Sequence, residues 1–185
     1  LKENIHSILN DINPDIIINC VGITTRRGVE ENIQNAKKLN TDLPHKIDSW
    51  AGSNSKKLIH FSTDCVFSGN RGNYNDNDFT DADDIYGKTK ADGEVNSEST
   101  LTLRCSMIGR EMYNFTELFE WLFKNKNKNI SGYSRVMYSG ITNVRMGKII
   151  KKIIIRICYL LFLLQNSMHL INTKCHNTLM KLLLD

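Results

Sequence analysis

The spacing of apolar residues predicts that helices and strands alternate through the first part of the chain. Residues 3–12 and 30–50 carry apolar side chains three or four positions apart, as helices do, and Pro44 is expected to kink or split the second helix. A near-continuous apolar run indicates a buried strand at 15–21, and further strands are expected at 57–62 and 101–105. With a further helix over 84–97, this alternation predicts an α/β fold with a doubly wound parallel sheet, whose ligands bind at the carboxyl ends of the strands.

The later part of the chain has a different pattern. Residues 68–80 are rich in Gly, Asn and Asp and predict a loop, and helices are expected at 114–124 and 142–155. The segment 153–164 is nearly all apolar, but its 12 residues are too few to span a bilayer. We therefore expect a buried core helix there and no membrane span. Residues after about 151 are interpreted as divergent, truncated or frame-shifted.

The composition favours a cytoplasmic protein with its own core. The 185 residues carry 24 Lys and Arg against 20 Asp and Glu, which gives a net charge of +4. The one dense basic run, 124–129, has no interleaved aromatic residues, so it predicts a solvated loop and no nucleic-acid partner. Five cysteines without a Cys-x-x-Cys pair indicate free thiols in a reduced compartment. No metal-ligand spacing occurs, and His60 is expected to be a strand residue.

Tyr86 and Lys90 form the pair with the clearest chemistry. Positions i and i+4 share one helix face, so the phenol and the ammonium can point into the same pocket. An ammonium beside a phenol stabilises the phenolate, so we expect it to lower the pKa of Tyr86 and make that residue a general acid/base. Thr63, just after the predicted strand at 57–62, can supply a hydroxyl to the reacting oxygen. The alternative is a solvated helix face with an incidental pair.

Several segments in one order resemble the extended short-chain dehydrogenase/reductase superfamily. Within it, the resemblance is to dTDP-4-dehydrorhamnose reductases and related nucleotide-sugar 4-ketoreductases, over about residues 10–150. It rests on Pro14–Gly22, Asn40-Thr41, Leu58–Gly69, Tyr86–Glu94 and Leu103–Ser106. The resemblance implies the C-terminal part of a Rossmann-like NAD(P)-binding domain over 1–106 and a partial substrate-binding region over 107–185.

The resemblance also implies a reaction. NADPH or NADH delivers hydride to a 4-keto-6-deoxy nucleotide sugar, in the synthesis of cell-surface polysaccharide precursors. Tyr86 donates the proton to the keto oxygen, Lys90 tunes Tyr86 and binds the nicotinamide ribose, and Thr63 positions the carbonyl. A homodimer is compatible with this reading.

Further site residues are assigned by the same resemblance. The cofactor is expected to contact Cys20, Val21, Gly22, Asn40, Ser62, Tyr86 and Lys90. The substrate is expected to contact Val66, Phe67, Arg104 and Met107. The alternative for Asn40 is a buried structural role. The alternatives for Arg104 are that it anchors a loop or forms a structural ion pair. Met107 stands where dTDP-4-dehydrorhamnose reductases tend to carry an aromatic residue, so a UDP-N-acetyl-dideoxyhexosulose reductase fits equally well.

Other members of the superfamily remain as alternatives. A 4,6-dehydratase would carry Glu at the position of Cys65, so dehydration is disfavoured, and 66–69 resemble the reductase form better than the epimerase form. A non-catalytic NAD(P)-binding regulatory subunit, such as that of methionine adenosyltransferase, is a second alternative. The retained Tyr86 and Lys90 favour an enzyme over this subunit. A degenerate product without activity is the third.

One expected element does not occur in the 185 residues. The family binds the cofactor pyrophosphate at a Gly-x-x-Gly-x-x-Gly turn, whose glycines let the backbone approach the phosphates. Gly69 and Gly72 follow no strand–helix junction and do not form this turn. We therefore interpret the chain as a fragment without its first βαβ units. Residues 1–185 alone are expected to be poorly soluble and to show no measurable NAD(P)H-dependent reduction.

Overall fold

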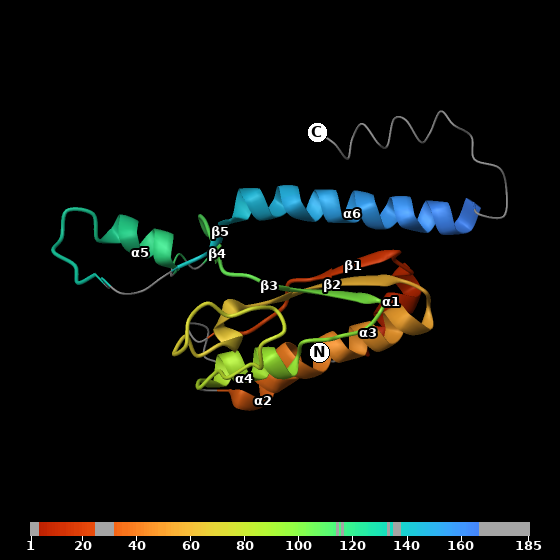
Figure 1. Ribbon diagram of the computed structural model, residues 1–185, viewed down its shortest axis with the longest axis horizontal. Coiled ribbons are helices and arrows are strands. Elements are labelled where there is room, and N and C mark those ends of the chain that lie inside the picture. The colour runs from red at the N-terminus through yellow and green to blue at the C-terminus, as the bar shows by residue number, and fades with distance from the viewer. Residues whose placement is uncertain are drawn as a thin grey trace. The chain divides into compact units, whose positions relative to one another are not determined.

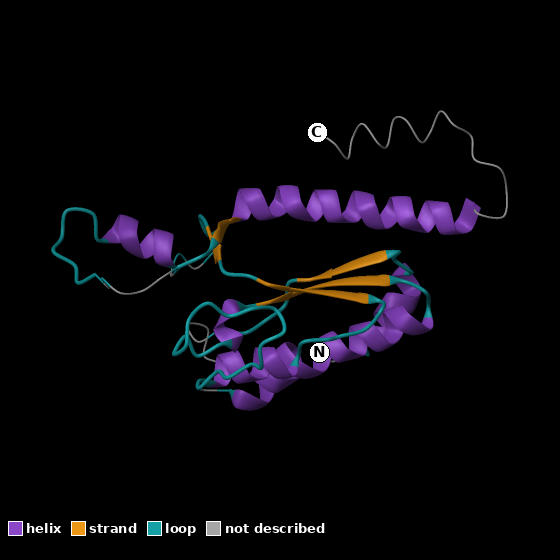
Figure 2. Cartoon of the chain, in the orientation of Figure 1, coloured by secondary structure: helices purple, strands orange, loops and turns teal. Residues whose placement is uncertain are grey.

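The computed structural model describes residues 4–24, 32–113, 115, 117–132, 134 and 138–166. The chain divides into two compact units, Leu1–Ser106 and Met107–Asp185. Figure 2 shows the strands of the first unit side by side, with its helices packed next to them, and along the chain the two kinds of element alternate. The predicted alternation of elements is therefore found in the unit that carries Tyr86 and Lys90.

A three-stranded parallel sheet forms the centre of the first unit. Its strands are β1 (Ile16–Asn19), β2 (Lys57–Ser62) and β3 (Thr100–Arg104), paired in that order. Because they run in one direction, their carboxyl ends meet at one edge of the sheet. The predicted α/β class with a parallel sheet is confirmed.

The helices of this unit lie on one side of the sheet (Figure 1). They are α1 (Ile5–Ile12), α2 (Ile33–Ala36), the π-helix η2 (Lys37–Asp42), α3 (Leu43–Ser53) and α4 (Ile85–Asp92), with a short 3-10 helix, η3 (Asp64–Val66), after β2. The core between α1, α3 and β2 consists of Leu9, Leu43, Ile47, Trp50, Ala51 and Leu58. Burial of these side chains supplies the main stabilisation of the unit.

The opposite face of the sheet carries exposed apolar side chains. Ile18, Ile59 and Leu101 are aligned across the three strands on this face. Ile59 is buried, whereas Ile18 and Leu101 are 42% and 41% exposed. The described sheet therefore has one packed face and one partly open apolar face.

A π-helix interrupts the helix predicted over 30–50. The expected effect of Pro44 is seen here, because proline has no N–H to donate to the carbonyl of Asn40 four residues earlier. The bonds widen instead, and the Leu43 amide donates to the carbonyl of Lys38, five residues back. Since η2 packs against α4, this irregular turn lies beside the helix of Tyr86 and Lys90.

The helix α4 is shorter than the 84–97 predicted from the sequence. It begins after Asp84, whose side chain accepts a hydrogen bond of 2.8 Å from the Gly87 amide. It ends at Gly93, where an added Cβ would lie 1.9 Å from the carbonyl oxygen of Asn40. The backbone passes so closely against η2 at this point that only glycine fits.

The second unit contains a short parallel strand pair and two helices. β4 (Met107–Ile108) pairs with β5 (Ile141–Thr142), and the helices are α5 (Leu118–Lys124) and α6 (Asn143–Asn166). α5 begins later than predicted, and α6 continues past the predicted end at 155 through the apolar segment. In the described part of the chain, no helix is both long and apolar enough to cross a membrane. Residues 167–185, interpreted above as divergent, lie outside the described residues.

The contact at Gly93 makes a stability prediction. We expect Gly93→Ala to lower the free energy of unfolding by about 1–3 kcal/mol, since the added methyl must displace the η2 backbone. Gly132→Ala is the matched control, because an added Cβ there meets no heavy atom within 4 Å. Urea unfolding followed by circular dichroism measures both, and an equal effect of the two substitutions would contradict the close contact.

Candidate active site

Polar residues gather where the three parallel strands end. β1 is followed by Cys20–Gly22, β2 by Thr63, and β3 ends with Arg104. The register pairs Ser62 at the end of β2 with Arg104, so these segments share one edge of the sheet. This edge is where ligands bind in open parallel α/β sheets.

A glycine seats the helix of the Tyr–Lys pair against this edge. At Gly87, an added Cβ would lie 2.3 Å from the carbonyl oxygen of Cys65 and 2.5 Å from Cβ of Ala82. The first turn of α4 therefore packs directly on η3, which follows Thr63. A side chain at position 87 would move Tyr86 away from the end of β2.

Lys90 is a buried cation held by the sheet. Its side chain comes from the last turn of α4, the residue is 4% exposed, and Nζ donates a 2.7 Å bond to the carbonyl oxygen of Phe61. Burial lowers the pKa of Lys90 to about 8, and the nearby Glu94 carboxylate opposes this shift. The ammonium is therefore charged at neutral pH, but a small rise in pH begins to deprotonate it.

Tyr86 differs from the sequence expectation in its pKa. Burial raises the pKa of Tyr86 above its ordinary value, and the hydrogen bond with the Thr63 side chain opposes the rise. The charges of Cys65, Asp64 and Cys105 raise it further. The predicted lowering of the Tyr86 pKa by Lys90 is not found, because burial destabilises the phenolate more than the polar neighbours stabilise it.

Thr63 connects β2 with the start of η3. The residue is 5% exposed, and its hydroxyl accepts a 3.1 Å bond from the Cys65 amide and donates at 3.2 Å to Oδ1 of Asp64. A hydroxyl oxygen has two lone pairs, so one remains to interact with Tyr86. The structure thus brings Thr63 and Tyr86 together and places Lys90 one helical turn further along α4.

Asn40 fastens the segment after β1 to α4. Its Oδ1 accepts from the Ile23 amide at 2.8 Å, while Nδ2 donates to the Ile23 carbonyl and to Oγ1 of Thr89, both at 3.0 Å. The side chain is fully buried. These contacts match the structural alternative for Asn40 and not a cofactor contact, because its polar atoms are already bonded to protein.

Ser62 and Arg104 both bond to Glu94, which the sequence analysis did not single out. Oε1 of Glu94 accepts from Ser62 Oγ at 2.6 Å and from Arg104 Nε at 2.9 Å, and Oε2 accepts from Arg104 Nη2 at 2.7 Å. The position of Glu94 one turn after Lys90 was the available signal. Arg104, predicted as a substrate contact, is therefore held in a fork-to-fork ion pair.

The remaining predicted substrate residues lie in different surroundings. Val66 is fully buried, so it packs in the core and is not placed to touch a ligand, which corrects its assignment. Phe67 is half-buried and stacks on Tyr74, with ring centroids 4.4 Å apart. Met107 is 48% exposed and belongs to β4 of the second unit.

Three thiols surround the strand ends without forming a metal site. Burial raises the pKa of Cys20, Cys65 and Cys105, while the Lys90 ammonium opposes the shift at Cys20 and Cys105. These thiols are protonated at neutral pH. Among the residues that the structure describes, no cluster of His, Cys, Asp or Glu has metal-binding geometry.

The chain matches the RmlD substrate binding domain over residues 2–131. It is 30% identical to a dTDP-4-dehydrorhamnose reductase of Aggregatibacter actinomycetemcomitans, over 68% of this chain and 45% of that protein. It is 28% identical to methionine adenosyltransferase 2 subunit beta of Pongo abelii, over 71% of this chain and 42% of that protein. The chain therefore spans less than half the length of these two relatives.

Solved structures show the same fold. A hypothetical dTDP-4-dehydrorhamnose reductase from Sulfolobus tokodaii superposes with a TM-score of 0.71 at 24% identity, over 81% of this chain and 55% of that one. A dTDP-4-dehydrorhamnose reductase from Bacillus anthracis, solved in complex with NADP, gives 0.69 at 25% identity with the same coverage.

The parallel sheet and these likenesses place the chain in the extended short-chain dehydrogenase/reductase class. Within that class, it belongs to the RmlD substrate binding domain family. This family includes NAD(P)-dependent reductases, and it also includes the subunit beta relatives.

His60 makes the stability of the unit depend on pH. It is fully buried, its Nδ1 accepts from Nδ2 of Asn19 at 3.1 Å, and Nε2 has no hydrogen-bond partner among the described residues. Burial lowers the pKa of His60 to about 4; the charges of Lys90 and His45 lower it further, and that of Glu94 opposes them. The neutral ring is thus the form that the fold accepts.

We expect the free energy of unfolding to rise between pH 4 and pH 6.5. In this window the unfolded chain protonates His60 and the folded chain does not, so acidification destabilises the fold, by on the order of 3 kcal/mol in total. His60→Asn keeps an acceptor for Asn19 and removes the titration. Urea unfolding at pH 7 and pH 4.5 should show a smaller difference for this variant. An unchanged difference would place the titration elsewhere.

Proposed function

We propose that this chain carries the catalytic residues of an NAD(P)H-dependent reductase of 4-keto-6-deoxy nucleotide sugars. The observation that carries the proposal is that Tyr86 hydrogen-bonds Thr63 and the buried Lys90 bonds the Phe61 carbonyl near the end of β2, at the carboxyl edge of a parallel sheet. A hydroxyl, a phenol and an ammonium in this order supply what carbonyl reduction needs, namely a contact for the keto oxygen, a proton donor and a positive charge.

The residues present fit the nicotinamide end of the cofactor. Lys90 has three N–H donors and its bond to Phe61 uses one, so the others can bind ribose hydroxyls. The backbone at Cys20–Gly22 passes the same edge, and an added Cβ at Gly22 would lie 3.3 Å from Oδ1 of Asn40, so glycine suits this tight segment. No Gly-rich turn in this sequence matches the pyrophosphate end, so only the nicotinamide half is assigned to these residues.

The proposed reaction assigns each group one task. A bound reduced nicotinamide supplies the hydride that C4 of the sugar accepts. Tyr86 gives its phenolic proton to the keto oxygen, so the carbonyl becomes an alcohol, and its raised pKa keeps it protonated and ready at neutral pH. Thr63 orients that oxygen. The charge of Lys90 stabilises the phenolate that remains on Tyr86.

A non-catalytic regulatory subunit is the second candidate. It is favoured by the 28% identity to methionine adenosyltransferase 2 subunit beta over 71% of this chain. The two candidates differ in turnover. A regulatory subunit would bind NADPH without oxidising it when a 4-keto nucleotide sugar is present, whereas the reductase would oxidise it.

We expect Tyr86→Phe to lower turnover by about 100-fold or more, because the proton donor is lost while the ring remains. The assay joins this chain to the Gly-rich first part of a dTDP-4-dehydrorhamnose reductase and follows NADPH oxidation with a 4-keto-6-deoxy nucleotide sugar. Tyr113→Phe is the matched control, since Tyr113 is 74% exposed in the second unit. Near-normal turnover in the Tyr86→Phe protein would eliminate the proposed acid.

We expect NADPH binding to the same joined protein to weaken as pH rises through about 8, where Lys90 loses its charge. Lys90→Met should bind NADPH weakly at every pH and show no such transition. Lys88→Met is the control, because Lys88 lies on the same helix and donates to the carbonyl of Asp83 at the surface. Fluorescence titration between pH 6.5 and 9.5 measures the affinity. A transition that survives in Lys90→Met would assign it to another group.

A further inference from the structure

A row of stacked side chains runs from Arg104 at the end of β3 into the loop between Thr63 and Tyr86. The Arg104 guanidinium lies over the Phe67 ring, with Cζ 5.0 Å from the centroid. Phe67 stacks on Tyr74 at 4.4 Å and an interplanar angle of 13°. The Arg71 guanidinium lies over Tyr74 at 4.7 Å. The row thus places two cations and two aromatic rings in successive contact, and each contact is of a favourable kind.

The row is anchored to the strand ends at its Arg104 end. Glu94 holds two nitrogens of the Arg104 guanidinium and the Ser62 hydroxyl, while Nη1 donates to the carbonyl of Asp76 at 2.8 Å. Ser62 immediately precedes Thr63. One side chain therefore joins the sheet edge to the far part of the loop, 28 residues earlier in the chain.

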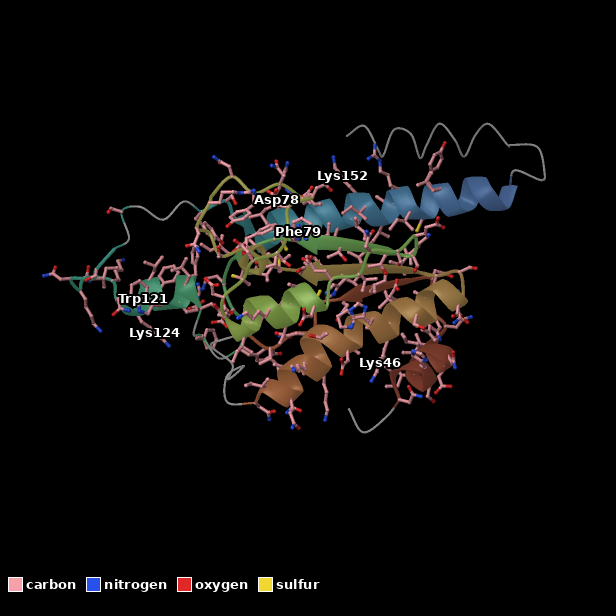
Figure 3. All side chains as sticks on the ribbon, turned by 60° about the horizontal axis from the view of Figure 1, so that its bottom comes forward. Lys46, Asp78, Phe79, Trp121, Lys124 and Lys152 are labelled. Carbon is pink, nitrogen blue, oxygen red and sulfur yellow. The ribbon has the colours of Figure 1, made fainter. Side chains whose placement is uncertain are left out.

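The other end of the row is closed by aspartates of the loop itself. Oδ2 of Asp81 accepts from Ser68 Oγ at 2.7 Å and from the Tyr74 hydroxyl at 3.0 Å, and Arg71 forms an ion pair with Asp78. Figure 3 shows Asp78 beside Phe79 on this loop. Hydrogen bonds from the backbone amides of Asn75 and Ser68, together with these side-chain bonds, lower the pKa of Asp78 and Asp81, so both stay ionised. A loop of this length without regular structure is ordered by its own side chains.

The charge of the loop indicates which part of a nucleotide sugar it can face. Residues 67–84 contain five aspartates and one arginine, so the segment carries a net charge of −4. A diphosphate is repelled by such a segment, whereas sugar hydroxyls are good donors to carboxylate and carbonyl oxygens. The segment also begins four residues after Thr63 and ends two residues before Tyr86, so its ends lie at the proposed reacting centre.

We propose that Arg104 is a positioning residue which, through the row Arg104–Phe67–Tyr74–Arg71, holds residues 67–81 as the preformed sugar-facing wall of the site. This inference rests on the proposed function for the identity of the ligand. All three guanidinium nitrogens of Arg104 are bonded to Glu94 or to the carbonyl of Asp76, so we assign Arg104 this positioning role in place of the expected substrate contact. Its effect on the sugar is transmitted through the loop.

Two variants are designed to break the row. Arg104→Lys keeps a positive charge beside Glu94 but loses the planar fork and its stacking face. Tyr74→Ala removes the central ring, and Tyr74→Phe keeps the stack and serves as the conservative rescue. Phe79→Ala is the matched control, because Phe79 lies on the same loop, is 96% exposed and stands outside the row.

The first measurement is hydrogen–deuterium exchange of the 185-residue chain. The amides of Ser68, Asn75 and Asp81 are bonded within the loop. We expect their exchange to accelerate about tenfold in Arg104→Lys and Tyr74→Ala, and to stay near wild type in Tyr74→Phe and Phe79→Ala. Unchanged protection in the first two variants would overturn the proposal.

The second measurement is equilibrium binding by the joined protein described above. Affinity for a dTDP- or UDP-linked 6-deoxyhexose should fall about tenfold in Arg104→Lys and Tyr74→Ala, while NADPH affinity stays unchanged. A parallel loss of NADPH affinity would indicate general loosening and overturn the positioning role. Wild-type protein that binds neither nucleotide sugar would also overturn it. Sugar binding with the expected losses, but without NADPH oxidation in the wild type, would support the wall and refute the reductase.

Discussion

The arrangement of the site depends on one fully buried amide. The side chain of Asn40 bonds the N–H and the carbonyl of Ile23 and the hydroxyl of Thr89, so it joins the segment after β1 to α4 through η2. Leaving any of these groups unpaired in the interior costs about 1–3 kcal/mol, which favours a single geometry over neighbouring ones. The face of α4 that carries Tyr86 and Lys90 is therefore fixed relative to the strand ends, and the close contacts at Gly87 and Gly93 remove the remaining freedom to slide.

A shared carboxylate also holds the site together electrostatically. Glu94 interacts electrostatically with Lys90 and pairs with Arg104, so one carboxylate serves the proposed ribose-binding cation and the anchor of the loop. A partly buried acid shared in this way keeps two cations partly desolvated without leaving any of the three groups uncompensated. The same group ties the end of β2 to β3 through Ser62. The sugar-facing loop and the proposed catalytic residues are thus coupled through few side chains, all at one edge of the sheet.

Elements set by local pattern were predictable from the sequence, and features set by distant contacts were not. The strand predicted over 57–62 coincides with β2, because the closely spaced apolar residues Leu58, Ile59 and Phe61 favour a short buried strand. The sequence places the end of α4 five residues too far, because Gly93 meets Asn40 of another helix and no local signal reports that contact. The pairing of Tyr86 with Thr63 followed from motif order, whereas the direction of the Tyr86 pKa shift depends on burial, which a motif does not encode. The row from Arg104 to Arg71 joins residues more than 30 positions apart, and only the folded chain brings them together.

The π-helix η2 also determines how this region can change in length. Each residue of an α-helix advances the chain by about 100°, so a single deletion within Lys37–Asp42 would rotate the residues before it by about that angle relative to α3. Asn40 would then turn away from Thr89 and Ile23 while every amino acid it needs remained in the sequence. The number of residues in η2 is thus as constrained as their identity. A one-residue gap here in an alignment with a related sequence would indicate that the site is lost, even where Tyr86 and Lys90 are both present.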